Sequence, residues 1–310
     1  MSVAFIFPGQ GAQTIGMGKA LADAYPAAAE VFAQVDAALG EPLSDLIWAG
    51  DQDTLTLTEN AQPALMATSL AALRALETEG LGLETASFVA GHSLGEYSAL
   101  CAAGAISLED TARLLRIRGQ AMQQAVPVGV GAMAAILGLD FEAANAIATE
   151  AASEGQVCQA ANDNDPGQVV ISGHKEAVAI AIDLAKAKGA KRAILLPVSA
   201  PFHCALMQPA ADAMAQALAD VKINTPQVPV VTNVRAEAVS DPDTLRALLV
   251  EQITGSVRWR ESVSWMGAQG VSEMWEIGAG KALSGMVRRI DRAIGCKAVG
   301  TPDDIAGLKA

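Results

Sequence analysis

Apolar and polar positions follow two different periods in the first third of the chain. Residues 3–7 and 87–90 are short apolar runs, and Pro8 and Gly9 end the first of them, so both runs predict strands. Residues 17–35 and 62–79 carry apolar side chains at helical spacing and predict helices. Strands that alternate with helices in this way are typical of an α/β layer fold.

A different order of elements occupies residues 126–198. The elements follow one another as β-α-β-β-α-β, which is the order of a split ferredoxin-like unit. We therefore expect a small ferredoxin-like subdomain, residues 127–198, inserted into a larger domain that consists of residues 1–126 and 199–310. The expected elements are strands 132–137, 157–161, 168–172 and 193–197, helices 141–153 and 175–188, and a turn at 162–167.

After this insert the pattern returns to longer helices. Residues 208–219, 242–252 and 259–269 predict helices, and residues 226–232 and 272–276 predict extended segments. The larger domain therefore continues the α/β pattern of the first third.

Composition and charge narrow the possible functions. With 310 residues and 51% hydrophobic content, the chain can bury a large core. No run approaches the length of a membrane-spanning helix, and the apolar start has no basic residue, so we expect a cytoplasmic protein that contacts no membrane. The net charge of -13 argues against nucleic acid as a partner. The 4 cysteines are widely separated, so we expect neither a disulfide nor a metal site.

The residues at 91–95, Gly-His-Ser-Leu-Gly, match the pattern G-x-S-x-G. In this pattern the glycines allow a sharp turn from a strand into a helix, which lifts the serine hydroxyl clear of the sheet. A plain tight turn is the alternative, but the strand predicted before it and the helix predicted at 108–124 favour a nucleophile, Ser93. The fold class expected from these features is α/β, with a large α/β-hydrolase-like domain around a parallel sheet and the small inserted subdomain.

A serine nucleophile needs a base, and the chain contains only 3 histidines. His92 is next to Ser93 and is poorly placed to reach its hydroxyl. His174 opens a predicted helix, where a solvated or capping role is expected. This leaves His203, in the irregular stretch 199–204, as the expected base.

The third member of such a triad is not fixed by the sequence. Asp163, Asp165 and Asp212 are available, and none of them can be placed beside His203 from sequence alone. A backbone carbonyl can also orient a histidine and fix its tautomer. Both kinds of partner stay open at this point.

Four motifs occur in order along the chain, and together they are more specific than any one of them. They are FPGQG at 7–11, GHSLGEY at 91–97, QVVISG at 168–173 and APFH at 200–203. This set resembles the malonyl-CoA:acyl carrier protein transacylases, and the resemblance runs from end to end. This set of motifs favours that family over the interpretation as a generic serine hydrolase.

The resemblance implies a role for each member of the catalytic set. Ser93 would carry the malonyl group as an ester, and His203 would act as general base and then as general acid. Gln252 matches the family glutamine whose backbone carbonyl orients the histidine. The backbone N–H groups of Gln10 and Leu94 would bind the oxyanion, although a plain strand-to-helix connection would also explain the turn that contains Gln10.

Three further residues match family positions that contact the substrate. Arg118 would pair with the free carboxylate of the malonyl group, because a planar fork of donors suits a carboxylate. Its position alone would predict a surface helix residue, and Arg116 competes for the assignment. Asn162 matches an asparagine near the cleft, where a turn residue is the commoner explanation. Phe202 matches a bulky residue against the α-carbon, so malonyl should be preferred over methylmalonyl.

The resemblance therefore implies transfer of a malonyl group from malonyl-CoA to an acyl carrier protein, without a metal or a tightly bound cofactor. A serine thioesterase, a discrete acyltransferase of a polyketide synthase and a non-catalytic docking subunit are the alternatives. Carrier proteins of this pathway resemble acidic helical bundles. Either a cluster of arginines or the lysines of the insert should therefore contact the carrier protein; the arginines are Arg288, Arg289 and Arg292.

Overall fold

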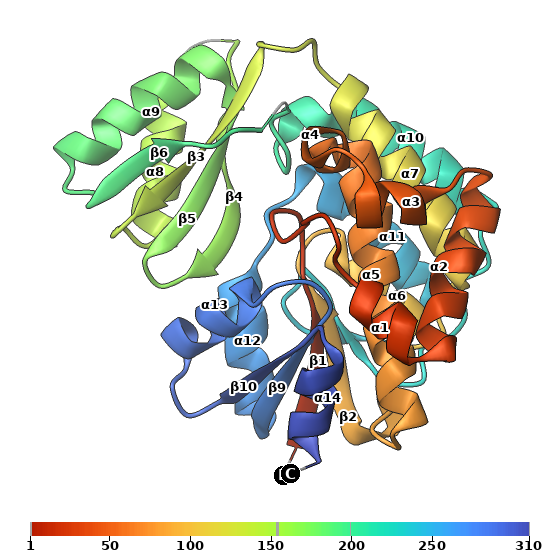
Figure 1. The fold of residues 1–310 in the computed structure, drawn as a ribbon. Helices are drawn as coiled ribbons and strands as arrows, with labels where there is room; N and C mark the ends of the chain where they lie inside the picture. Colours follow the sequence, from red (N-terminus) through yellow and green to blue (C-terminus); the bar gives the residue numbers. More distant parts are fainter. Residues whose placement is uncertain (1, 153–154, 199, 310) are drawn as a thin grey trace.

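The computed structural model describes residues 2–152, 155–198 and 200–309. Within these residues the strands form two separate sheets, one of six strands and one of four (Figure 1). The expected α/β class is confirmed, because a sheet of mainly parallel strands is joined to a second, antiparallel sheet. No helix of the described residues is long and apolar enough to cross a membrane.

The larger sheet has the strand order β10-β9-β1-β2-β7-β8. Strand β1 (Ser2–Phe7) lies at its centre and pairs in parallel with β2 (Ala86–Gly91) and β9 (Val271–Ile277). Only the last pair, β7 with β8, is antiparallel. The remaining strands are β7 (Val230–Val231), β8 (Ala238–Val239) and β10 (Gly295–Val299).

Both faces of this sheet are covered by helices, which is why β1 is apolar at every buried position. Val3, Phe5 and Phe7 pack into one core cluster, while Ala4 and Ile6 pack into another on the opposite face. The second cluster contains α12 (Trp259–Ala268) and α13 (Ala282–Ile290). The first contains α1 (Lys19–Ala24), α2 (Pro26–Leu39), α3 (Leu43–Ala49), α4 (Gln52–Thr56), α5 (Thr58–Thr78), α6 (Gly95–Ala102), α7 (Leu108–Gln124), α10 (Gln208–Ala219), α11 (Pro242–Thr254) and α14 (Pro302–Leu308).

The smaller sheet has the order β4-β5-β3-β6, and all of its pairs are antiparallel. This is the arrangement expected for a ferredoxin-like β-α-β-β-α-β unit. Two helices cover one face through an apolar cluster, and Figure 1 shows the unit as a separate green lobe. Its elements are β3 (Gly131–Leu137), α8 (Phe141–Ala151), β4 (Cys158–Asp165), β5 (Gln168–His174), α9 (Lys175–Ala187) and β6 (Arg192–Leu195). The subdomain limits 127–198 stay a prediction.

The structure corrects the helix predicted at 17–35. Two helices, α1 and α2, occupy this stretch, because Tyr25 is extended immediately before Pro26. A proline disfavours helical geometry at the preceding residue. The helix predicted at 141–153 ends at Ala151 in the described chain, and Ser153 and Ser199 lie outside the described residues.

The structure also corrects the turn predicted at 162–167. Strand β4 continues through Asp165, and only Pro166 and Gly167 form the turn. Asn and Asp favour turns when they are solvated, but residues 162–165 are all buried. Partners from the larger unit bind three of these side chains instead: Arg260 binds Asp163, His92 binds Asn164, and Arg289 binds Asp165.

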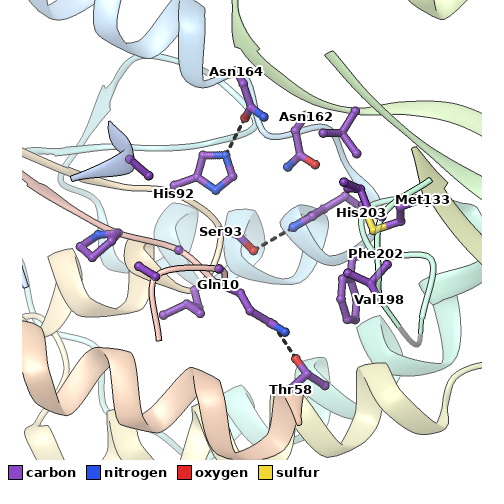
Figure 2. Close-up of a pocket in the computed structure, with 18 of the residues that line it drawn as sticks. Gln10, Thr58, His92, Ser93, Met133, Asn162, Asn164, Val198, Phe202 and His203 are labelled. Carbon is purple, nitrogen blue, oxygen red and sulfur yellow. Dashed lines mark hydrogen bonds between the residues drawn. The ribbon is translucent and has the colours of Figure 1, made fainter. Parts of the chain in front are cut away.

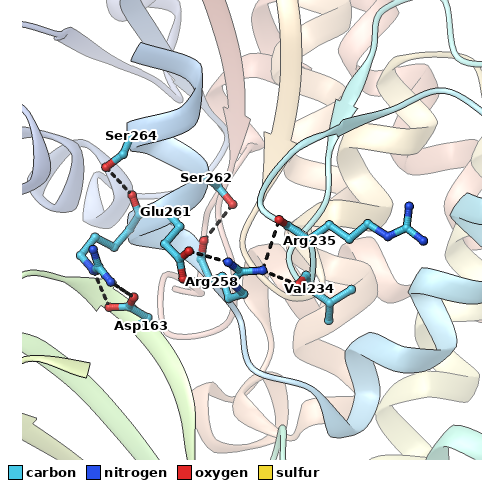
Figure 3. Close-up of polar contacts among 8 residues, drawn as sticks. Asp163, Val234, Arg235, Arg258, Glu261, Ser262 and Ser264 are labelled. Carbon is cyan, nitrogen blue, oxygen red and sulfur yellow. Dashed lines mark hydrogen bonds and ion pairs between the residues drawn. The ribbon is translucent and has the colours of Figure 1, made fainter. Parts of the chain in front are cut away.

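The end of β4 therefore holds the two units together. Val257, just before α12, exchanges backbone hydrogen bonds with Ala161 and Asp163. Arg260 Nε lies 3.0 and 2.9 Å from the two carboxylate oxygens of Asp163. Figure 3 shows Asp163 on the small sheet, below Glu261 of α12. The Nε of Arg289 on α13 lies 2.7 Å from Asp165 Oδ2. Buried carboxylates need such partners, so these pairs fix the small sheet against α12 and α13.

Several short elements have no counterpart among the predicted ones. They are α3 and α4 and, after residue 276, α13, β10 and α14. The extended segment predicted at 226–232 forms a strand only at β7. Of these, α13 matters most for function, because it borders the cavity described next.

Candidate active site

A cavity of about 460 Å³ lies between the two units. The larger unit contributes the turn after β1, the turn after β2 and α13, and the small sheet contributes its uncovered face (Figure 2). Seven of the eight residues predicted for the site line this cavity, and the eighth, Gln252, is buried behind it. The seven are Gln10, Ser93, Leu94, Arg118, Asn162, Phe202 and His203.

Ser93 stands on a sharp turn between β2 and α6, and its backbone is left-handed with φ 53°. Both glycines of the motif are required by close backbone approach. A Cβ at Gly91 would lie 1.9 Å from the carbonyl of Gly95, and a Cβ at Gly95 would lie 2.3 Å from the carbonyl oxygen of Phe7. The local sequence therefore dictates this turn, which points the Ser93 hydroxyl into the cavity.

His203 contacts the Ser93 hydroxyl, with 2.8 Å between its Nε2 and Ser93 Oγ. Its other ring nitrogen, Nδ1, lies 2.8 Å from the backbone carbonyl oxygen of Gln252. Because a carbonyl can only accept, the ring proton is on Nδ1, and Nε2 is left to accept the hydroxyl proton.

No carboxylate takes part in this contact among the described residues. Asp163 and Asp165 of β4 are two candidates for the third member, and both are paired with arginines of α12 and α13. The third candidate, Asp212, accepts a hydrogen bond from Gln208 on α10. A carbonyl thus occupies the position that an acid occupies in a Ser-His-Asp triad.

Burial and, to a smaller extent, the nearby Arg118 guanidinium lower the pKa of His203 to about 3. A base must be unprotonated, so we expect the rate of Ser93 acylation to show no acid inflection near pH 6.5, the ordinary value. The same depressed pKa affects folding. Between pH 6.5 and about 3 the unfolded chain binds a proton at His203 and the folded chain does not, so the free energy of unfolding falls as pH falls below 6.5. The single-turnover rate of acylation, measured between about pH 5 and 8, checks the kinetic prediction. A fall in this rate with an inflection near pH 6.5 would contradict it.

Arg118 is buried at 1% exposure, which corrects the surface position that its helix alone predicts. Its Nη2 lies 3.1 Å from Ser93 Oγ and 2.8 Å from Gln252 Oε1, and its Nη1 lies 2.7 Å from Gln62 Oε1. None of these partners is a carboxylate. The buried Glu96 interacts electrostatically with this guanidinium, but the hydrogen bonds of its carboxylate go to Asn233 and Gln252. A buried guanidinium that is hydrogen-bonded to no anion is unfavourable, so an anionic ligand in the cavity would stabilise it.

Arg116, the competing candidate, points elsewhere. Its guanidinium pairs with Glu41 and donates hydrogen bonds to the backbone carbonyl of Glu59 and to the side chain of Asn60. It does not line the cavity. Two residues apart on a helix, the two arginines lie on different faces.

The remaining predicted residues border the same space. The side chain of Gln10 accepts a hydrogen bond of 2.9 Å from Thr58, and Leu94 is the N-cap residue of α6, where backbone N–H groups point outward. Asn162 is a buried strand residue of β4 and not the turn residue that composition suggests. Phe202 packs against the small cluster that contains Met133.

Comparison with known proteins places this arrangement in a family. The acyl transferase domain family matches residues 4–284. The chain belongs to the acyl transferase family.

Relatives within this family match nearly the whole chain. The malonyl CoA-acyl carrier protein transacylases of Bacillus subtilis (strain 168) and Escherichia coli (strain K12) are 48% and 49% identical over 303 residues, which cover 98% of this chain and 95% and 97% of theirs. The crystal structure of an acyl-carrier-protein S-malonyltransferase from Bartonella henselae matches with a TM-score of 0.97 at 57% identity, over 99% of this chain and 98% of that one. The resemblance carried by the four motifs is confirmed.

The other two histidines of this acyl transferase have structural partners. His92 is half-buried at the edge of the cavity, its Nε2 lies 2.8 Å from Asn164 Oδ1, and its ring contacts Trp259 edge-on. His174 is the N-cap residue of α9, but its side chain makes no capping hydrogen bond. Its Nδ1 accepts a hydrogen bond of 2.8 Å from the backbone N–H of Val157. The side-chain capping role expected as one of two possibilities is therefore wrong, because the backbone N–H of Val157, just before β4, occupies this ring nitrogen.

Sequence reasoning missed several polar residues of the site. Gln62 joins Thr58 to Arg118 through its side-chain amide, and Asn233 and Glu96 lie behind Ser93. Glu96 belongs to the GHSLGEY motif, which was the only signal available for any of them. Their partners come from distant segments, so no local pattern predicts these contacts.

Proposed function

We propose that this acyl transferase moves the malonyl group of malonyl-CoA onto the phosphopantetheine thiol of an acyl carrier protein, with Ser93 as the covalent carrier. One observation supports this most: Ser93 Oγ lies 2.8 Å from His203 Nε2 and 3.1 Å from Arg118 Nη2. A base and a buried guanidinium at one hydroxyl suit a substrate that has both a reactive acyl carbon and a free carboxylate.

In the first half-reaction, Ser93 Oγ attacks the thioester carbon while His203 Nε2 takes the hydroxyl proton. The backbone N–H groups of Gln10 and Leu94 donate to the oxyanion that forms. The C–S bond then breaks, and the CoA thiol leaves with the proton from His203. Through its carbonyl, Gln252 keeps the imidazole in the required tautomer.

In the second half-reaction, the phosphopantetheine thiol gives its proton to His203 and attacks the malonyl ester. The ester C–O bond breaks, and Ser93 Oγ regains the proton. One thioester is exchanged for another, so the balance needs no oxidant, metal or cofactor, and malonyl-CoA is a substrate. Arg118 would bind the malonyl carboxylate, Phe202 would limit the α-substituent, and Asn162 would contact the acyl or pantetheine part.

A cytoplasmic location completes the proposal, since all four cysteines are free and a reducing compartment suits such a chain. A role in polyketide synthesis is a narrower alternative. One similar structure, 43% identical, is a type II PKS acyl-carrier protein in complex with its malonyl-transacylase. The chemistry is the same, and a comparison of kcat/KM for the two kinds of carrier protein separates the pathways.

The function is tested by measuring the intact mass of the protein after brief mixing with malonyl-CoA. We expect a malonyl adduct that is discharged by a carrier protein with its phosphopantetheine arm and is retained with the same carrier lacking the arm. An adduct that decays at one rate with either carrier would indicate a thioesterase. No adduct would indicate a docking subunit.

The contact with the carrier protein gives a further prediction. Arg288 and Arg292 are exposed at and beyond the end of α13, and Leu283 and Met286 of this helix line the cavity. Reversing both charges to glutamate should lower kcat/KM for the carrier about tenfold at low salt, because rim charges steer acidic partners.

The matched control reverses Lys186 and Lys188, which lie on and after α9 of the small unit. Acylation from malonyl-pantetheine, which carries no phosphate, should stay unchanged in both double variants. If the α9 variant loses carrier transfer and the α13 variant does not, the lysines make the contact. If neither variant loses it, both assignments are wrong.

A further inference from the structure

A buried carboxylate and a buried carboxamide lie behind Ser93, on the side away from the cavity. Glu96, on α6, and Asn233, after β7, are each 1% exposed. Neither lines the cavity, and the reaction described above uses neither of them. Burying a carboxylate is unfavourable unless its contacts repay the desolvation, so the contacts of Glu96 require an explanation.

Asn233 spans the turn that carries Ser93. Its Oδ1 accepts a hydrogen bond of 2.8 Å from the backbone N–H of Ser93, and its Nδ2 donates one of 2.7 Å to the carbonyl oxygen of Gly91. Ser93 holds a left-handed backbone, which is strained for a residue other than glycine and persists only where the surroundings fix it. A carboxamide has the one donor and one acceptor that this turn needs.

Glu96 connects that turn to the support of the base. Its Oε2 accepts hydrogen bonds from the backbone N–H of Asn233 at 3.0 Å and from Gln252 Nε2 at 2.8 Å. The backbone carbonyl of Gln252 in turn holds His203. One carboxylate oxygen therefore joins the segment that carries the nucleophile to the helix that orients the base.

The two hydrogen bonds of Glu96 do not require its charge, although these bonds and the nearby Arg118 oppose the effect of burial on its pKa. Burial raises the pKa of Glu96 to about 7, and both of its hydrogen bonds are accepted by a single oxygen, while Oε1 has no partner among the described residues. A glutamine would present a carbonyl oxygen of the same reach at the place of Oε2. The side chain thus acts through geometry, as a shared acceptor.

We propose that Glu96 and Asn233 are positioning residues that hold Ser93 Oγ and His203 Nε2 at their contact distance. This inference rests on the proposed function, because it assigns the network to acyl transfer at Ser93. It explains why a 2.8 Å contact between residues from segments 110 positions apart is kept in a cavity that must admit two different thiols.

The test compares Glu96→Gln, Glu96→Ala and Asn233→Ala in the full chain, with malonyl-CoA as donor. We expect Glu96→Ala and Asn233→Ala to lower the single-turnover acylation rate about 100-fold, because a displacement of about 1 Å at the reacting atoms has an effect of this size. The KM for malonyl-CoA should change little, and Glu96→Gln should restore most of the rate.

Circular dichroism and thermal melting report whether each variant folds, and rates are compared per folded molecule. If Glu96→Ala does not fold, Asn233→Ala carries the test, since it leaves the carboxylate in place. Folded alanine variants with the wild-type rate, a loss confined to KM, or a Glu96→Gln variant as slow as Glu96→Ala would overturn the inference. A wild-type protein that forms no malonyl adduct would instead overturn the proposed function.

Discussion

Ser93→Ala is expected to abolish the malonyl adduct and to reduce malonyl transfer by roughly 10⁴-fold or more. Without Ser93 Oγ, no hydroxyl beside His203 Nε2 can accept the malonyl group. The carrier thiol would then have to attack malonyl-CoA directly. The cavity and its oxyanion N–H groups would remain, so binding of malonyl-CoA should persist. Intact mass after brief mixing, together with binding of malonyl-CoA by calorimetry, measures both effects.

Ser98→Ala is the matched control for this variant. Ser98 lies on the same helix, α6, and is as buried as a residue can be at 0% exposure, but it does not line the cavity. Its replacement should leave the adduct in place. An adduct that survives Ser93→Ala would place the nucleophile elsewhere and would contradict the proposed cycle.

Arg118→Ala is expected to change the choice of acyl group. Malonyl transfer should fall about 10²–10³-fold, because truncating one partner of a buried charged contact costs about 2–5 kcal/mol. Acetyl transfer should fall far less, since an acetyl group has no carboxylate to lose. The ratio of kcat/KM for malonyl-CoA and acetyl-CoA measures this directly and cancels effects common to both donors.

Arg118→Ala should also lower the rate with both acyl donors to the same extent, because Arg118 contacts Ser93 Oγ and Gln252 Oε1. Arg116→Ala removes the same side chain two residues earlier on α7, where the guanidinium pairs with Glu41 outside the cavity. It should leave the ratio unchanged. Equal losses for malonyl and acetyl in Arg118→Ala would remove the assignment of this residue to the malonyl carboxylate.

Sequence patterns predicted elements well where the signal was local. The helix expected at 108–124 has these limits in the structure, because Ser107 caps it by accepting a hydrogen bond from the backbone N–H of Asp110 and its apolar positions repeat at helical spacing. The break at Pro26 was also encoded locally and was overlooked. The strand at 162–165 was not encoded locally, since Asn and Asp are typical of turns. It forms because arginines of α12 and α13 pair with Asp163 and Asp165, and His92 contacts Asn164.

By itself the sequence determined the α/β class, the turn that carries Ser93, and membership of a family with ordered motifs, because periodicity and glycine spacing are properties of neighbouring residues. Only the tertiary structure decided that Arg118 is buried and that Glu96 joins Gln252 to Asn233. Local patterns left the partner of His203 open, and only the family resemblance pointed to the Gln252 carbonyl that lies 2.8 Å from its Nδ1. A carbonyl belongs to every residue and leaves no signature. A contact between residues 156 positions apart, such as that of Glu96 with Gln252, exists only once the packing of α11 against the Ser93 turn brings them together.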